Sequence, residues 1–374
     1  MKIDIVEDPQ SFAQIRQEWT DLCLRSSPHQ YFQTFDWHWT WWTHVGSPKG
    51  DKLRIIIVRE SGCVVSIWPL VIARQSSCRV LRWMADDVSD YCDVLIDRET
   101  EARECLKKAW DVLRSISGAD VLKLDHVRAD SPIRSLLEKE ICETPSISVA
   151  PFIELERWKN WPTYYAAFKK NLQVKTHSRK LRRLKEKGPV SFTIVNNEKN
   201  LDNIVQLMIR QKIGRFEEKG QSGVWDKGSH VAFLLSAVKN AFADNTLHLS
   251  VLSVNDHAIA IHLGWRYNNC LYYYIPTFDL SFRQFSPGRI LLENLLEWCF
   301  TNNVKMFDFM LGDETYKYNW TNSEMQSYSY ASPITLWGRV YFKWVTGSLK
   351  LFLKSIFDRM PSVLRRRMGI LLKK

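Results

Sequence analysis

The segment 286–290, Ser-Pro-Gly-Arg-Ile, has the residue types of a helix start that binds an anion. Ser286 is a favoured N-cap residue, and Pro287 suits the first helical position. The next amides, at Gly288 and Arg289, then lack an intrahelical acceptor at the positive end of the helix dipole. An arginine there is unfavourable unless an anion is bound, and glycine lets a ligand approach the backbone closely. The sequence therefore predicts a phosphate cradle formed by Ser286, Pro287, Gly288, Arg289 and Ile290. The alternative is an ordinary capped helix whose arginine points to solvent.

A predicted strand at 257–267 presents one histidine between small residues. Because side chains alternate along a strand, Ala260, His262 and Gly264 share one face. The small neighbours leave room for a ligand to lie across that face. The alternative is a half-buried histidine that a neighbouring side chain satisfies.

The elements that must position these residues follow the order strand, turn, strand, helix and strand over 257–309. An Asn-Asn pair at 268–269 separates the first two strands, and the helix begins at the Ser-Pro pair. The first half of the chain also alternates, with a hairpin at 53–73, a helix at 100–116 and a strand at 121–127. The Pro- and Ser-containing stretch 143–151 is the best boundary between the halves. The pattern predicts an α/β (α+β) protein of two domains.

A basic helix is predicted at 162–187, near the start of the second half. Its last turns hold Lys175, Arg179, Lys180, Arg182, Arg183, Lys185 and Lys187. A charge run of this kind is usually a solvated face. The functional alternative is a clamp for an anionic ligand, with Arg179 and Arg183 as contacts.

Composition indicates a packed globular protein. The 374 residues suffice for two domains, and 45% of them are hydrophobic. No apolar run reaches the roughly 18 residues of a spanning helix, and residues 1–10 lack the apolar core of a signal peptide. The eight cysteines show no CxxC and no metal-ligand spacing with histidine. We therefore expect reduced thiols, a cytoplasmic protein and no metal.

The net charge of +11 is concentrated at the C-terminus. Residues 339–374 contain ten Lys or Arg and one acid, a charge of +9 that leaves +2 for the rest of the chain. General nucleic-acid binding is therefore not expected. An apolar stripe runs through this tail at Val345, Leu349, Phe352 and Ile356. Stripe and charge together predict a basic amphipathic helix on an anionic membrane surface. The alternative is a terminal helix docked on the protein.

The ordered motifs of the second half resemble a known family. They are an aromatic strand at 272–274, the Ser-Pro-Gly turn with its apolar helix, Phe-Asp-Phe at 307–309, Gly312, Glu314 and Tyr316-Lys317. This order resembles the CelD/BcsL-type acetyltransferases of the GNAT superfamily, which are associated with cellulose and other envelope polysaccharides. The stretches 32–42 and 89–96 look like the first half of that family. One departure is that the phosphate loop keeps a single glycine, Gly288.

The resemblance implies a tandem architecture like that of the Fem-type aminoacyltransferases. Each half would be a GNAT-like domain, with a mixed, mostly antiparallel sheet flanked by helices. We expect a first GNAT-like domain at 1–147, an acyltransferase domain with the CoA site at 148–336, and the basic amphipathic tail at 337–374.

The resemblance also implies a reaction in which an amine, or a hydroxyl, attacks an acyl thioester directly. His262 is the candidate base because its unperturbed pKa lies near 6.5, and Asp308 and Glu314 are competing carboxylates. Tyr316 is the candidate proton donor to the leaving sulfur. The expected substrate contacts are Tyr274, Arg179, Arg183 and Lys317, the last holding a phosphate or a sugar acid.

Three classes of function are open at this point. The first is an N-acyltransferase (EC 2.3.1 type) that uses acetyl-CoA or a longer acyl-CoA and acts on an amine-bearing envelope polysaccharide, amino-sugar or amino-lipid precursor. The second is a Fem-like transferase, the one case in which a nucleic acid, charged tRNA, is an expected partner. The third is a non-catalytic accessory protein of a polysaccharide synthase. The expected location is the cytoplasm, with peripheral attachment to the inner face of the membrane through 339–374.

Overall fold

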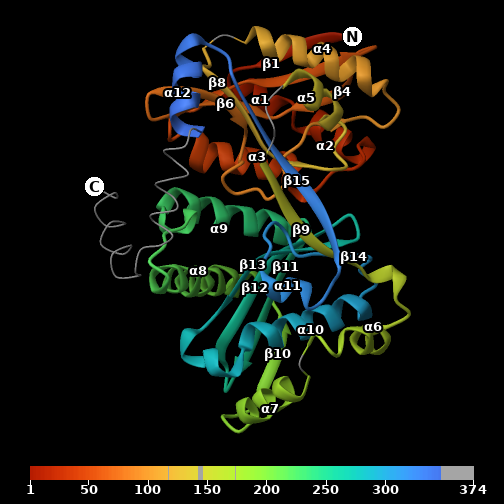
Figure 1. Ribbon diagram of the computed structural model, residues 1–374, viewed down its shortest axis with the longest axis vertical. Helices are drawn as coiled ribbons and strands as arrows, with labels where there is room; N and C mark the ends of the chain where they lie inside the picture. The colour runs from red at the N-terminus through yellow and green to blue at the C-terminus, as the bar shows by residue number, and fades with distance from the viewer. Residues whose placement is uncertain (117, 142–145, 173, 347–374) are drawn as a thin grey trace. The chain divides into compact units, whose positions relative to one another are not determined.

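The computed structural model describes residues 1–116, 118–141, 146–172 and 174–346 (Figure 1). They form two compact units. The first unit comprises residues 1–148 and the described residues from 326 onward, and the second comprises 149–325. The sequence-based division placed residues 326–336 in the second domain, whereas here the chain returns to the first unit at that point.

The strands of the first unit form two groups. One has the order β1-β3-β4-β7 and is antiparallel, and the other has the order β15-β8-β6-β5-β2. In the second group β6 and β8 run parallel, while the remaining pairs are antiparallel. The bounds are β1 (Lys2–Val6), β2 (Lys52–Leu53), β3 (Ile55–Glu60), β4 (Cys63–Trp68), β5 (Leu70–Gln75), β6 (Cys78–Trp83), β7 (Leu95–Ile96), β8 (Val121–Arg128) and β15 (Ser323–Pro333).

The helices of the first unit bury apolar faces against these strands. The bounds are α1 (Pro9–Gln14), α2 (Arg16–Arg25), α3 (Phe35–Trp41), α4 (Ala102–Ser115), α5 (Arg134–Glu140) and α12 (Leu336–Thr346), with short turns at Tyr31–Gln33 and Trp42–Gly46. Helix α4 contributes Leu106, Ala109 and Trp110 to a core that also contains Trp68 and Trp83. Burial of this apolar surface is the main stabilising term of the unit.

The strands of the second unit have the order β10-β11-β12-β13-β14-β9. The β13–β14 pair is parallel, and the other pairs are antiparallel. The bounds are β9 (Ser146–Glu154), β10 (Val190–Ile194), β11 (Leu247–Val254), β12 (His257–Tyr267), β13 (Cys270–Phe278) and β14 (Met306–Asp308). Asn268 and Asn269, with φ of 49 and 58, form the tight turn between β12 and β13 that the Asn-Asn pair predicted.

The helices of the second unit cover this sheet. The bounds are α6 (Trp161–Phe168), α7 (Val174–Lys185), α8 (Leu201–Glu218), α9 (Gly228–Ala243), α10 (Pro287–Thr301) and α11 (Thr315–Tyr318). Short turns lie at Leu155–Arg157, Glu198–Asn200, Val224–Asp226 and Leu280–Phe285, the last labelled η6. The mixed α/β class with mostly antiparallel strands flanked by helices is therefore confirmed. Of the helices described, none has the length and apolarity needed to cross a membrane.

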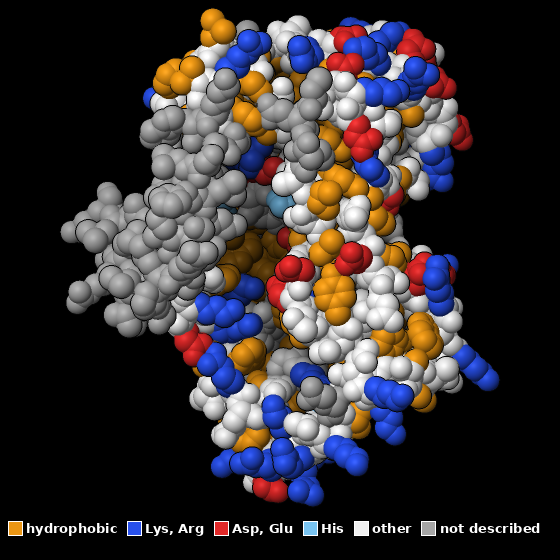
Figure 2. Space-filling model, viewed as in Figure 1, with side chains coloured by type: hydrophobic (Ala, Val, Ile, Leu, Met, Phe, Trp, Pro, Cys, Tyr) orange, Lys and Arg blue, Asp and Glu red, His pale blue; other side chains and the backbone are white. Residues whose placement is uncertain are grey.

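The region predicted as one basic helix, 162–187, is two helices. Tyr164 and Phe168 of α6 pack with the residues of β13, β14 and α10, whereas Leu184 of α7 packs beside β12 and the start of α10. Two different packing sites require two helix directions, which explains the break. Lysines and arginines gather on the outer surface of α7 (Figure 2). The predicted tail helix lies outside the described residues beyond 346, and so do the stripe residues Leu349, Phe352 and Ile356.

Candidate active site

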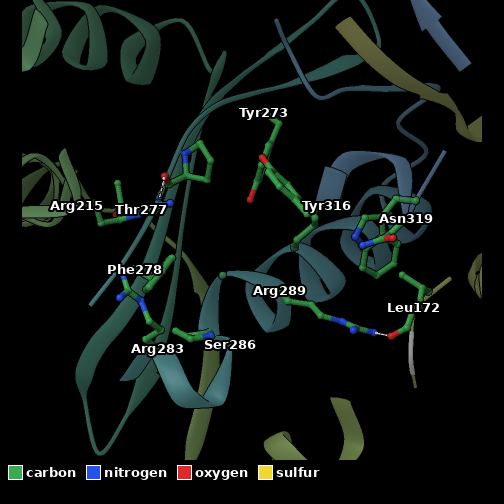
Figure 3. Close-up of a pocket in the computed structure, with 15 residues that line it drawn as sticks. Leu172, Arg215, Tyr273, Thr277, Phe278, Arg283, Ser286, Arg289, Tyr316 and Asn319 are labelled. Atoms are coloured by element: carbon green, nitrogen blue, oxygen red, sulfur yellow. Dashed lines mark hydrogen bonds between the residues drawn. The ribbon is translucent and has the colours of Figure 1, made fainter. Parts of the chain in front are cut away.

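A cavity of about 320 Å³ lies at the start of α10 in the second unit (Figure 3). Its lining consists of Leu172, Arg215, Tyr273, Pro276, Thr277, Phe278, Arg283, Ser286, Pro287, Gly288, Arg289, Leu292, Tyr316, Asn319 and Trp320. Ser286, Pro287, Gly288, Arg289 and Tyr316 were predicted from the sequence. Ile290 is buried beside them and does not line the cavity.

The cavity opens where two parallel strands part. Strand β14 pairs with β13 only from Cys270 to Tyr272, because β14 ends at Asp308. Strand β13 continues to Phe278, and its other edge stays paired with β12. Beyond Tyr272 this edge of β13 is not paired with β14, and Tyr273, Pro276, Thr277 and Phe278 line the cavity there.

The N-terminus of α10 is built differently from the predicted capped helix. Ser286 adopts a left-handed conformation (φ 56, ψ 53), and its side chain makes no capping hydrogen bond. Its Oγ instead accepts a hydrogen bond from Lys180 Nζ of α7 at 2.7 Å. The amides of Arg289 and Ile290 both donate to the Ser286 carbonyl, at 3.1 and 3.3 Å. Within the described part of the chain, the Gly288 amide has no recorded acceptor. Of the two free amides that the sequence predicted, Gly288 and Arg289, only that of Gly288 is therefore available to a ligand.

Gly288 leaves open space in front of this donor. A Cβ at this position would come no closer than 3.5 Å to Phe278, which is ordinary contact. Packing within the protein therefore does not require glycine here. The absent side chain leaves the amide accessible from the cavity.

Three arginines surround the cavity, and two of them were missed by sequence reasoning. Arg215 of α8 donates to the Pro276 carbonyl at 3.4 Å and lies over the Phe278 ring at 4.4 Å. Burial lowers the pKa of Arg215 from its ordinary value. Arg283 of η6 pairs with Glu218, with Nη1 to Oε1 at 2.6 Å. No local pattern marks Arg215, because 61 residues separate it from Pro276.

Arg289, the predicted arginine, turns away from the Gly288 amide. Its guanidinium donates to the Leu172 carbonyl (Figure 3). Its Nε is buried without a hydrogen-bond partner among the described residues. Burial lowers the pKa of Arg289, and the nearby Glu293 carboxylate partly opposes that effect.

Two tyrosines lie side by side in the cavity (Figure 3). Burial raises the pKa of Tyr273 well above its usual value, and the neighbouring Tyr316 adds to the shift. The side chain of Tyr316 is 39% exposed, and desolvation of its hydroxyl, with a smaller contribution from Glu314, raises its pKa. Both hydroxyls therefore keep their protons at neutral pH and can donate them.

His262, the predicted base, lies outside the cavity and is completely buried. Its ring stacks on Tyr273 at 4.6 Å between centroids and lies 5.8 Å from the His248 ring. Burial holds the pKa of His262 well below its ordinary value, and His248 lowers it further. In the described structure neither ring nitrogen of His262 has a hydrogen-bond partner.

The strand face that carries His262 is covered rather than open. Its neighbour Ala260 packs against Ile290 and Leu291 of α10. A Cβ on Gly264 would lie 2.1 Å from the Tyr272 carbonyl oxygen, so the β13 backbone fills the space that the small residue leaves. The small residues flanking His262 thus serve close packing.

The predicted residues after β14 form a compact group beside the cavity. Lys317 is buried, and its Nζ donates to the carbonyls of Met310, Leu311 and Gly312 at 3.1, 2.8 and 3.1 Å. Glu314 pairs with the same ammonium at 2.9 Å. Since these contacts occupy all the donors of Lys317, it holds the 310–314 loop rather than offering a charge to a ligand.

Asp308 and the expected substrate contacts also lie outside the lining. Asp308 is buried, and its Oδ1 accepts a hydrogen bond from the Met310 amide at 2.8 Å. Tyr274 contacts the rings of Trp225 and Trp265. Arg179 and Arg183 are exposed on α7. Within the described ranges, no group of three or more His, Cys, Asp or Glu could hold a metal ion.

Comparison with known proteins agrees with this geometry. Residues 172–318 match the family model for the acetyltransferase (GNAT) domain, and that region contains most of the cavity lining. The matched residues lie within the second unit, so this part of the chain is similar to the acetyltransferase (GNAT) domain. No curated protein matches the chain in sequence.

Solved structures are similar over most of the chain. The structure of FemX is 12% identical, covers 92% of this chain and 100% of its own, and has a TM-score of 0.57. The C-terminal domain of a protein from Agrobacterium fabrum described as a lysylphosphatidylglycerol synthetase is 11% identical, with coverages of 86% and 91% and a TM-score of 0.53. A protein of unknown function from Bacteroides thetaiotaomicron is 10% identical, with coverages of 88% and 99% and a TM-score of 0.52. These likenesses show the fold that the two units share with these proteins.

Proposed function

We propose that the second unit transfers an acyl group from acyl-CoA, acetyl-CoA or a longer homologue, to an amine. The observation that supports this most directly is the cavity where the free amide of Gly288 and the open edge of β13 meet. The GNAT family match supports the same reaction class.

The cavity suits the phosphate end of such a donor. The start of α10 is a positive helix end whose first turn contains no acid. Arg215, Arg283 and Arg289 add positive charge, and the described lining contains no Asp or Glu. In this proposal the pyrophosphate accepts from the Gly288 amide, and Arg283 and Lys180 supply positive charge nearby. When bound, acyl-CoA supplies an activated thioester.

In the transfer step the amine nitrogen bonds to the thioester carbon, the carbon–sulfur bond breaks, and the electron pair leaves with sulfur. The hydroxyl of Tyr316 stays protonated at neutral pH because its pKa is raised; it donates this proton to the thiolate and regains one from solvent. Tyr273 lies beside it and can return a hydrogen bond to the phenolate.

The proton lost by the amine requires an acceptor that solvent can reach. None of the three predicted bases lines the cavity, and His262 and Asp308 are buried, whereas Glu314, which pairs with Lys317, is not. Glu314 is exposed and is close enough to Tyr316 to influence its pKa. We therefore assign the role of base to Glu314, acting directly or through water.

The resemblance to the CelD/BcsL-type proteins suggests the acceptor class. It would be an amine-bearing precursor of an envelope polysaccharide, an amino sugar or an amino lipid, acylated on the cytoplasmic side of the membrane. An amine is consistent with a lining that provides a proton donor for sulfur.

A second candidate donor is aminoacyl-tRNA, as in the Fem-type enzymes. It is favoured by the exposed basic side chains of α7, for which the described structure records no ion-pair partner: Lys175, Arg179, Arg182, Arg183 and Lys185. Such a surface suits a phosphate backbone, with binding that weakens steeply as salt rises.

Titration calorimetry with acetyl-CoA, longer acyl-CoAs and tRNA distinguishes these functions. We expect acyl-CoA to bind and to be consumed when an amino-sugar or amino-lipid acceptor is added. Binding of tRNA alone would favour the Fem-like donor. Binding of neither would leave the accessory role in a polysaccharide synthase complex.

A further inference from the structure

The outer face of α12 in the first unit is apolar. Leu336, Trp337 and Val340 are 78%, 51% and 57% exposed, and Ile334, just before the helix, is 41% exposed. Nearly all large apolar side chains of the described structure are buried or half-buried, so four exposed ones within seven residues stand out. Exposed apolar clusters of this kind mark interaction sites. We call these four residues the α12 patch.

Backbone contacts on the inner side of α12 hold the patch outward. Gly338 is buried, and a Cβ there would lie 1.9 Å from the Asp120 carbonyl oxygen, so the helix axis approaches the body as closely as glycine allows. The amides of Ile334 and Thr335 donate to the same carbonyl at 2.8 and 3.2 Å. Thr335 Oγ1 also bonds Asp120 Oδ1 at 3.1 Å and accepts from the Gly338 amide at 3.0 Å. The orientation of the patch is therefore built into the fold.

Asp120, which anchors α12 through these contacts, also forms an ion pair. Arg79 donates to both carboxylate oxygens of Asp120, at 3.0 and 2.9 Å. The Arg79 amide adds a third hydrogen bond at 3.0 Å. These contacts lower the pKa of Asp120 to about 2, so the carboxylate is charged at all physiological pH values.

The charge near the patch identifies a partner of opposite sign. Helix α12 contains no acid, and Arg339 is exposed between Trp337 and Val340. From Arg339 to the last residue the sequence has ten Lys or Arg and one acid. Leu, Trp and Val next to basic residues are typical of segments that lie in the headgroup region of a bilayer. A nucleic acid would match the charge but not the aliphatic side chains.

We propose that the α12 patch docks on an anionic lipid membrane. Leu336, Trp337 and Val340 enter the interface, while the exposed Arg339 and the positive charge of the sequence after it attract the anionic lipid headgroups. The helix has 11 residues, about 16 Å at 1.5 Å per residue, so it lies in the interface rather than across a hydrocarbon core of roughly 30 Å. This surface belongs to the first unit and does not depend on the acyl transfer proposed for the second.

Vesicle flotation of the full chain tests the proposal. Vesicles of equal parts phosphatidylglycerol and phosphatidylcholine are compared with phosphatidylcholine alone, at low and high salt. We expect binding to the anionic vesicles that salt weakens, because headgroup attraction is screened. Leu336→Ser with Val340→Ser should lower partitioning by about tenfold or more, since two apolar side chains no longer leave water. Trp337 is kept in this variant because its Nε1 donates to the Ser77 carbonyl at 3.3 Å.

Leu24→Ser is the matched control. Leu24 is 74% exposed in the same unit but lies outside the patch, so this change should leave flotation unaltered. Circular dichroism and a thermal melt establish that each variant is folded. Transfer to a soluble amine should be equal in all of them, which separates failure of this proposal from failure of the acyltransferase proposal.

Three results would overturn the proposal. In the first, the folded double variant floats as the wild type does. In the second, the full chain binds neither vesicle at low salt. In the third, light scattering shows a dimer that the double variant abolishes, with no vesicle binding, which would make the patch a contact between two copies of the chain.

Discussion

The two units place a helix between two parallel strands in the same way, yet the two helix starts differ. Helix α4 connects β6 to β8, and α10 connects β13 to β14. Helix α4 starts after Glu101 and has Glu104 in its first turn. Helix α10 has no acid in its first turn and begins with proline and glycine. Acids already satisfy the positive end of α4, whereas the end of α10 is open to an external anion.

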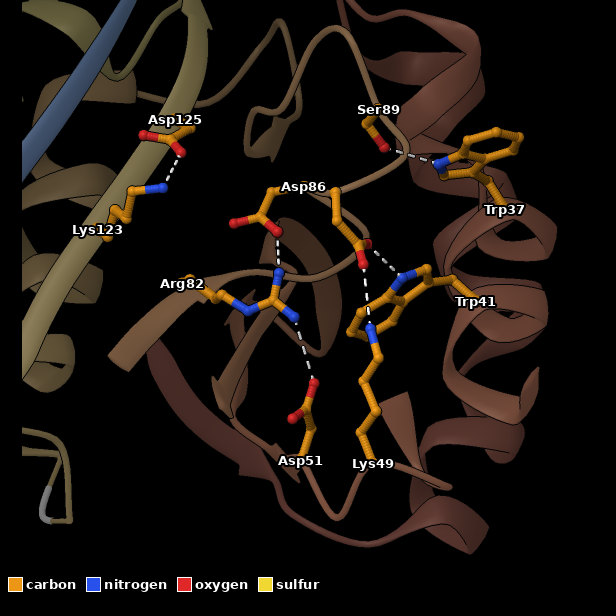
Figure 4. A network of polar contacts seen from close by, with 10 residues as sticks. Trp37, Trp41, Lys49, Asp51, Arg82, Asp86, Ser89, Lys123 and Asp125 are labelled. Carbon is orange, nitrogen blue, oxygen red and sulfur yellow. Dashed lines mark hydrogen bonds and ion pairs between the residues drawn. The ribbon is translucent and has the colours of Figure 1, made fainter. Parts of the chain in front are cut away.

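The segments that lead into the two helices differ as well. In the first unit, Arg82 near the end of β6 is buried and pairs with Asp51 at 3.3 Å and with Asp86 (Figure 4). Next to it, Trp41 Nε1 donates to Asp87 Oδ1 at 2.7 Å. Behind β13 the second unit has the cavity lined by Tyr273 and Gly288. The same connection therefore accompanies a buried ion-pair network in one unit and a cavity in the other, and the side chains around it differ.

The largest expected effect tests the charge difference between the helix starts. Gly288→Asp should weaken acetyl-CoA binding on the order of 100-fold, because a carboxylate near the pyrophosphate costs a few kcal/mol. Titration calorimetry measures the dissociation constant for acetyl-CoA. The matched variant is Ala102→Asp at the start of α4, which should leave affinity unchanged. Equal losses in both would show that the first unit also binds the donor.

Gly288→Ala separates charge from shape at the same position. The added Cβ meets nothing nearer than 3.5 Å, and alanine is the better helix former, so the variant should be at least as stable as the wild type. Affinity should fall by only a few-fold. An unchanged affinity in a folded Gly288→Asp variant would mean that the donor phosphates bind elsewhere.

The second effect concerns the proton donor. Tyr316→Phe should lower kcat about 100-fold with little change in KM for the donor. Because burial raises the pKa of Tyr316, the donating form persists above neutral pH, and the wild type should show no loss of kcat from this group below pH of about 10. Tyr330→Phe, a buried tyrosine of the first unit, is the control. A kcat that Tyr316→Phe does not change would remove Tyr316 from the mechanism.

A smaller effect distinguishes the exposed base from the buried histidine. Glu314→Gln should lower kcat about tenfold, because the amide cannot accept the proton of the amine, and the acidic limb of the pH–rate profile is then compared between wild type and His262→Ala. His262→Ala should keep that limb, because the pKa of His262 lies well below its ordinary value and the ring has no exposed surface. Loss of the limb in His262→Ala would restore histidine as the base.

The smallest effect on activity, though not on stability, is expected at the anchor of α12. Asp120→Asn should lower the free energy of unfolding of the first unit by about 1–3 kcal/mol, since its partners lose a charged acceptor. The Asp120 pKa is lowered to about 2, so the contribution of this carboxylate is present above pH of about 4 and is lost as pH falls through about 2. Urea unfolding at pH 7 and at pH 3 measures this. The free energies of unfolding of wild type and variant should differ less at pH 3 than at pH 7. Turnover at pH 7 should not change.

Local pattern predicted the elements between residues 257 and 309 well, although it joined α6 and α7 into one helix. The Asn-Asn turn and the helix start at Pro287 depend on residues adjacent in sequence, and both are where the pattern put them. The capping of Ser286 was wrong because Lys180, more than a hundred positions earlier, takes its hydroxyl. His262 was expected on an open face because the alternation of one strand cannot show that α10 packs over it. Arg215 went unnoticed because its partner Pro276 is distant along the chain.

By itself the sequence determined the mixed α/β class, the helix start without an acid and the single glycine in the first turn of that helix. These follow from backbone preference, side-chain alternation and charge over a few residues. Three features were decided by the tertiary structure alone. Strands β13 and β14 part after Tyr272, and Lys317 donates its hydrogen bonds to the 310–314 loop. Gly338 lets α12 approach Asp120 closely, with Trp337 exposed on the other side. Each of these depends on which distant segments come into contact, and burial and hydrogen bonding there are properties of the whole fold.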